Sequence, residues 1–66
     1  MRYEFSLASE LSSTGAAAFP ELTVRPRPGG GTTLYGPVTD RAALMGLLAR
    51  FENLGLSILE MRQLPD

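Results

Sequence analysis

The chain has no cysteine, no histidine and no lysine among its 66 residues, and each absence excludes a kind of site. Without cysteine there is no disulfide framework and no thiolate metal centre. Without histidine the chain lacks the commonest metal ligand and the only side chain that titrates near neutral pH without help. We therefore expect no catalytic residues, no metal ligands and no cofactor-binding residues.

An excess of one charge and a long hydrophobic run are also missing. Six arginines stand against seven acidic residues, for a net charge of −1. No overall field therefore draws the chain toward nucleic acid or an anionic membrane. No apolar run approaches the ~20 residues of a membrane span, and the N-terminus has no signal-peptide pattern. We expect a cytoplasmic protein without membrane or nucleic-acid partners.

The length predicts one domain over residues 1–66. A domain this short buries roughly 60% of the surface that its unfolded chain exposes. Small domains usually gain stability from disulfides, a metal or a partner subunit. Since the first two supports need residues that the chain lacks, association with another subunit is the one that remains.

Four segments alternate between apolar and polar residues, which is typical of half-buried strands. In the first segment, Tyr3 and Phe5 share one face. We expect Leu34, Leu59 and Met61 on that same side of the sheet. The four segments are residues 2–8, 21–27, 32–38 and 57–64.

Two further segments predict helices. Between residues 9 and 20, N-cap residues precede three alanines, so we expect a short helix that ends before Pro20. The second helix begins after Asp40 and ends at Gly55, which suits the left-handed residue of a helix C-terminus. Its apolar stripe consists of Leu44, Leu47, Leu48, Phe51 and Leu54.

The order strand, helix, strand, strand, helix, strand predicts an α+β fold. With right-handed crossovers, this is the ferredoxin-like split βαβ arrangement (βαββαβ), a four-stranded antiparallel sheet with two helices on one face. In this fold Leu48 and Phe51 of the long helix pack against Phe5, Leu34 and Leu59 of the sheet.

Three consecutive glycines, residues 29–31, suggest a phosphate-binding loop at first sight. Such a loop must lead into a helix N-terminus, and the P-loop also needs a lysine. Here the glycines lead into a predicted strand, and the chain has no lysine. We interpret them as the turn of a hairpin.

The sheet face away from the helices is the candidate functional surface. RNA-recognition domains use this face to stack bases on aromatic rings, but here Tyr35 is the only aromatic residue expected on it. Arginine and glutamate around Tyr35 would suit a two-fold contact with a second copy, and a plain solvated face is the alternative. The candidate self-association residues are Glu4, Arg25, Arg27, Tyr35, Ile58, Glu60 and Arg62.

A recurring pattern occupies residues 29–64: a Gly-Gly-Thr-Thr hairpin, Gly-Pro-Val, an Asp-led Ala-Ala-Leu helix and a Leu-Gly-Leu turn. In this pattern the chain resembles a group of short stand-alone proteins of high-GC bacteria whose function is uncharacterised. The resemblance implies a stand-alone domain and brings no activity or site residue with it.

We expect a small binding or assembly module that self-associates through the sheet face, as a dimer or larger homo-oligomer, without catalytic activity. One alternative is a regulatory domain of the ACT kind, in which paired domains hold a small ligand at their interface. That alternative rests on fold analogy. A less favoured one is a cofactor-free enzyme with a pocket between sheet and helices.

Overall fold

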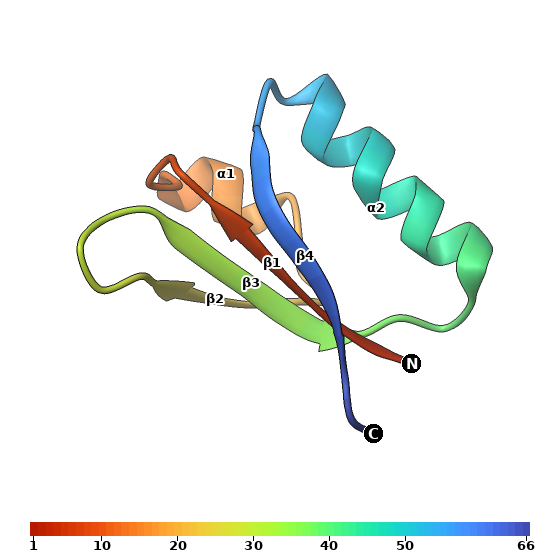
Figure 1. Cartoon of the computed structure of the whole chain (residues 1–66). Coiled ribbons are helices and arrows are strands. Elements are labelled where there is room, and N and C mark those ends of the chain that lie inside the picture. Colours follow the sequence, from red (N-terminus) through yellow and green to blue (C-terminus); the bar gives the residue numbers. More distant parts are fainter.

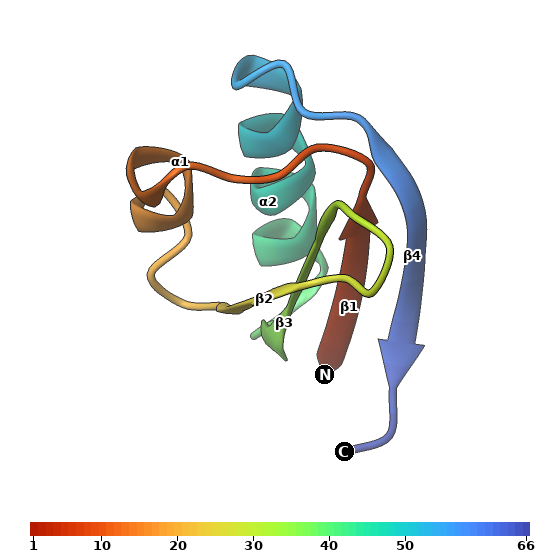
Figure 2. The same cartoon turned by 90° about the vertical axis from the view of Figure 1, so that its left-hand side faces the viewer.

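The computed structural model describes all 66 residues. The sheet has the order β2-β3-β1-β4, and every neighbouring pair is antiparallel. Both helices lie on the same side of it (Figures 1 and 2). The predicted ferredoxin-like split βαβ fold is therefore confirmed. The elements are β1 (Arg2–Leu7), α1 (Ser13–Ala17), β2 (Thr23–Pro26), β3 (Thr32–Pro37), α2 (Arg41–Asn53) and β4 (Ile58–Leu64).

Aromatic rings form the centre of the core between the helices and the sheet. The ring of Phe51 in α2 lies 4.5 Å from that of Phe19 and 5.0 Å from that of Phe5, measured between centroids. Phe5 is opposite Leu34 in the sheet, and both are fully buried. Leu48, predicted to be buried beside Phe51, is only half-buried and packs at the margin of this core.

Both ends of α2 have the caps that the sequence predicts. At the start, Asp40 Oδ1 accepts a hydrogen bond from the Ala43 backbone N–H at 2.8 Å. At the end, Gly55 has a φ of 71°, and the Leu56 N–H donates to the Phe51 carbonyl at 2.9 Å. These two features are those of a Schellman C-terminus.

The stripe of α2 is buried at Leu44, Leu47 and Phe51. Leu54 departs from the prediction, because its side chain is 49% exposed. It is the C-cap residue, where the chain leaves the helix, and its side chain therefore no longer follows the buried stripe.

The first helix is short, as predicted, and begins at a serine cap. Ser12 Oγ accepts from the Gly15 N–H at 3.1 Å, and the helix has five residues. An isolated helix of this length is unstable in water. Contacts with the rest of the molecule must therefore hold it in place.

The glycine run is a hairpin turn, as predicted. The Gly30 N–H donates to the Arg27 carbonyl at 3.0 Å, and Gly29 follows Pro28 with a φ of 84°. This is the geometry of a type II turn. Gly31 has a second role, because a Cβ atom there would lie 2.3 Å from the carbonyl oxygen of Leu7.

Strand β4 contains an irregularity that corrects two predictions. Leu7 is opposite Ile58 and Ser6 is opposite Glu60, so Leu59 is an extra residue in a β-bulge. Ile58 consequently packs against the core and not on the open face, and Leu59 is 59% exposed and not in the core. A bulge shifts the alternation of the strand by one residue.

Met61 lies on the side predicted for it but is not buried. It is opposite Phe5 in the register and so belongs to the helix side of the sheet, yet its side chain remains 42% exposed. Strand β4 lies at the border of the sheet, next to β1 (Figure 1). The border position leaves this side chain only partly covered.

Candidate functional site

The open face of the sheet brings most of the predicted association residues together in two rows. The register gives the composition of each row, counted from β2 across β3 and β1 to β4. The first row is Thr23, Tyr35, Glu4 and Arg62, and the second is Arg25, Thr33, Ser6 and Glu60. In the second row, the opposite charges of Arg25 and Glu60 lie at opposite borders of the sheet.

Three of the predicted charged side chains interact within the chain. Arg62 Nε donates to Glu4 Oε1 at 3.1 Å, and Arg27 reaches the Leu7 carbonyl at 3.4 Å, a long hydrogen bond. Arg25 and Glu60 form no ion pair in the chain. These two side chains are therefore free to meet charges of another molecule.

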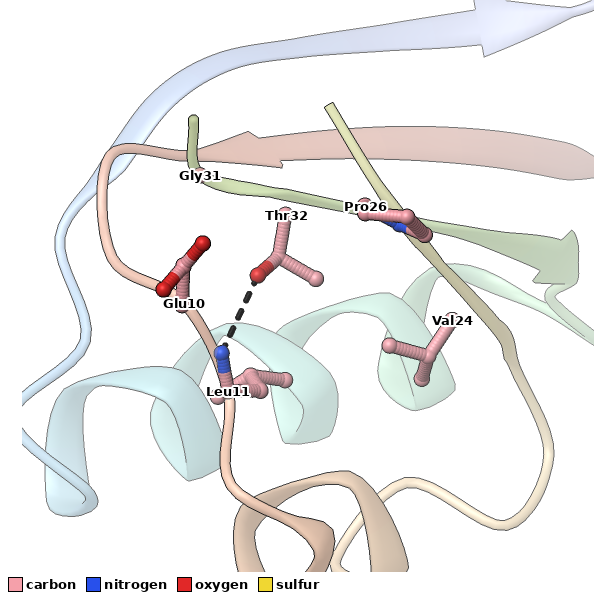
Figure 3. A pocket seen from close by; sticks show the side chains of 6 residues that line it. All are labelled: Glu10, Leu11, Val24, Pro26, Gly31 and Thr32. Atoms are coloured by element: carbon pink, nitrogen blue, oxygen red, sulfur yellow. Dashed lines mark hydrogen bonds between the residues drawn. The ribbon is translucent and has the colours of Figure 1, made fainter. Parts of the chain in front are cut away.

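A hollow of about 250 Å³ opens beside the loop between β1 and α1 (Figure 3). The hydroxyl of Thr32, which lines it, accepts from the Leu11 N–H at 3.1 Å and donates to the Ser9 carbonyl at 2.8 Å. Glu10 is the only other chemically active side chain in the lining, and it is exposed. A hydroxyl that holds a loop and one carboxylate do not make an acid–base pair.

No sequence pattern predicts this hollow. The sequence predicts Thr32 only as the first residue of a strand, because its contacts with Ser9 and Leu11 join segments more than 20 residues apart. Over the whole chain, no three acidic side chains come together. No helix has both the length and the apolar character needed to cross a membrane.

The two edge strands at the borders of the sheet, β2 and β4, differ in length and in proline content. The prediction of the association face did not take this difference into account. Strand β2 has four residues and ends at Pro26, and Pro28 follows in the turn. Strand β4 has seven residues and no proline, and its outer side is not paired with another strand (Figure 2). The length of β4 was visible in the sequence, but the exposure of Leu59 and Met61 was not.

The fold and this surface define a small ferredoxin-like α+β domain whose polar side chains lie on a sheet face and border. More particularly, the chain belongs to the family of the domain of unknown function DUF8691, which matches residues 2–62. No curated protein and no solved structure matches the chain. The family match extends from the first residue of β1 into β4, and so covers every element before β4 and the larger part of β4.

Proposed function

We propose that this domain is a self-associating assembly module that acts by binding a second copy of itself. The observation that carries the proposal is the exposed border strand β4. It presents two exposed apolar side chains, Leu59 and Met61, at 59% and 42%. It also contributes Glu60 and Arg62 to the open face, so the predicted polar surface and the exposed apolar side chains meet on this strand.

The small size of the core supports the proposal. Nine apolar side chains are buried, and the chain has no cysteine that could add a disulfide. Fully burying a leucine or methionine contributes about 1.5–3 kcal/mol relative to leaving it exposed. Covering Leu59 and Met61 by a second subunit would therefore add appreciably to the few kcal/mol by which a domain of this size is stable.

The ACT-like alternative needs the same first step. A small ligand held between paired domains requires paired domains, so self-association comes before any ligand. Within one chain, the hydroxyl of Thr32 in the hollow is already engaged by two backbone groups. These contacts therefore favour a protein surface over a small molecule as the first partner.

Light scattering after gel filtration tests the proposal, over concentrations from about 1 μM to about 1 mM. We expect at least a dimer at tens of micromolar, and a monomer at every concentration would overturn the proposal. Met61→Gln should shift the protein toward monomer, because it places an amide where an apolar contact forms. Met45→Gln is the matched control, since Met45 is a 53% exposed methionine on α2. Equal effects of the two substitutions would show that the contact lies elsewhere than β4.

A further inference from the structure

We infer that β4 pairs antiparallel with β4 of a second copy, about a two-fold axis at Met61. This inference rests on the proposed self-association and specifies its partner and geometry. The contact would join two four-stranded sheets into one continuous sheet. Border strands add to one another in this way because their free backbone N–H and C=O groups form a ready template.

Of the two edge strands at the borders of the sheet, β2 and β4, the one suited to such pairing is β4. Natural sheets protect their borders by short strands and prolines. Strand β2 has both protections, with four residues that end at Pro26. Strand β4 has seven residues without proline, and its bulge lies at its beginning, so the residues from Glu60 onward keep a regular register with β1.

The charges of β4 are self-complementary in one register. With the axis at Met61, Glu60 lies opposite Arg62 of the partner subunit, and the same pair forms a second time by symmetry. Directly opposite charges stabilise a strand pair, whereas like charges destabilise it. An axis at Glu60 would place two glutamates opposite each other, and an axis at Arg62 would do the same with two arginines. The charges therefore select the register at Met61 and disfavour its neighbours.

The backbone geometry agrees with this register. Along a border strand, outward-pointing backbone groups come from every second residue. An axis at a residue pairs positions of equal parity, so outward groups meet outward groups and each side chain keeps its side of the sheet. Met61 is also the middle residue of Ile58–Leu64. The regular part of the pairing spans Glu60–Arg62 of both copies, and beyond it the bulge at Leu59 of each strand faces the end of the other.

The same pairing would cover the exposed methionine. In an antiparallel pair, opposite residues have Cβ atoms about 4.5–5.5 Å apart. The two copies of Met61 would therefore be in contact on the helix side of the joined sheet, where each is 42% exposed in the single chain. On the open side, Arg62 would lie between Glu4 of its own chain, with which it already pairs at 3.1 Å, and Glu60 of the partner subunit.

A single cysteine provides the geometric test, because the natural chain has none. Opposite Cα atoms in an antiparallel pair are about 4.5–5.5 Å apart, within the ~4.4–6.8 Å that a disulfide spans. Under mild oxidation, Met61→Cys should give a disulfide-linked dimer nearly completely. Ala49→Cys, at an exposed position on α2, is the control and should form far less. Equal cross-linking of the two variants would overturn the inference.

Charge exchange tests the register independently of cysteine chemistry. Glu60→Arg alone and Arg62→Glu alone each place like charges opposite each other twice, and should weaken association roughly ten- to a hundredfold. An equimolar mixture of the two variants should recover most of the affinity, because both cross-strand pairs then have opposite charges. Circular dichroism of each variant shows whether it is folded before the comparison.

The outcomes separate this inference from the proposal on which it rests. If the natural chain associates, failure of the mixture to recover affinity, or absence of cross-linking in Met61→Cys, would overturn the β4 pairing and leave self-association standing. A natural chain that stays monomeric would overturn both, and the β4 border would then be open to a strand of a different protein.

Discussion

The two βαβ halves of the domain follow the same plan but are stabilised in different ways. In the second half, α2 has thirteen residues and caps at both ends, and β4 has seven residues. In the first half, α1 has five residues and β2 has four. The second half thus contains a helix with its own buried stripe, whereas the first half depends on side chains that reach it from other elements.

Two side chains of the second half make these contacts. The hydroxyl of Thr32 in β3 accepts a hydrogen bond from the backbone of the loop before α1 and donates another to it. Arg50 of α2 donates to the Ala18 carbonyl at 3.0 Å and to Glu21 Oε1 at 2.8 Å, and its guanidinium lies 5.4 Å from the centre of the Phe19 ring. The first half therefore docks onto the second through hydrogen bonds and one shared aromatic cluster.

Phe51 of the second half packs against two rings of the first half, and its removal should have the largest effect on stability. Phe51→Ala removes a ring that contacts both Phe19 and Phe5, and such truncations cost about 3–5 kcal/mol. This approaches the whole stability of a small domain, so we expect the variant to be largely unfolded by circular dichroism. Leu54→Ala, at a 49% exposed position on the same helix end, should cost far less. Similar unfolding curves for the two variants would contradict this assignment of the core.

In the hairpin between the halves, substitution of Gly31 should destabilise the fold more than substitution of Gly30. Both have a positive φ, 91° and 112°, and alanine in such a conformation costs roughly 1–2 kcal/mol. Only at Gly31 would the added Cβ atom also collide with the backbone, 2.3 Å from Leu7 O. We expect Gly31→Ala to lower the Tm clearly more than Gly30→Ala. Equal losses would show that the close approach to β1 is unimportant.

Removing the hydroxyl of Thr32 should loosen the first half while leaving the second intact. Thr32→Val keeps the shape but leaves the Leu11 N–H and the Ser9 carbonyl without their partner, at a cost of about 1–3 kcal/mol. Hydrogen exchange should rise first around α1, as in local unfolding. Thr33→Val, on the open face beside it, is the control and should leave exchange unchanged. A uniform rise along the whole chain would contradict a local role.

The sequence predicts the second half better than the first because the signals of the second half are local. The stripe of α2, the Asp40 cap and the Gly55 terminus all depend on neighbours within a few residues, and all three are found, except that the stripe does not extend to Leu54. The hydrogen bonds of Thr32 and Arg50 join segments 21 to 32 residues apart. Contacts of that kind leave no periodic pattern in a single sequence.

The candidate surface was predicted in composition but not in register. Five of its seven residues form the two rows of the open face, namely Glu4, Arg25, Tyr35, Glu60 and Arg62. The bulge at Leu59 exchanged the environments of Ile58 and Leu59, because one inserted residue reverses the alternation without any local signal. The ion pair between Glu4 and Arg62 of the same chain was likewise not predicted, because it depends on β1 and β4 being neighbours in the sheet.

The smallest expected effect is a pH dependence at the contact that joins the halves through Arg50. The side-chain hydrogen bond from Arg50, followed by a backbone hydrogen bond at Glu21, lowers the pKa of the Glu21 carboxyl below its ordinary value of 4.5. Because the folded value lies below the unfolded one, the stabilisation is present above pH 4.5 and is lost as the pH falls through the folded pKa. Glu21 is 43% exposed, so solvent screening limits the contribution to under ~1 kcal/mol.

Urea unfolding from about pH 7 to about pH 3 should show a smaller acid-induced loss of stability for Glu21→Gln than for the natural chain. Glu10→Gln, which removes a carboxylate without an ion pair, is the control, and identical curves for the two variants would contradict a specific role of the Arg50 contact.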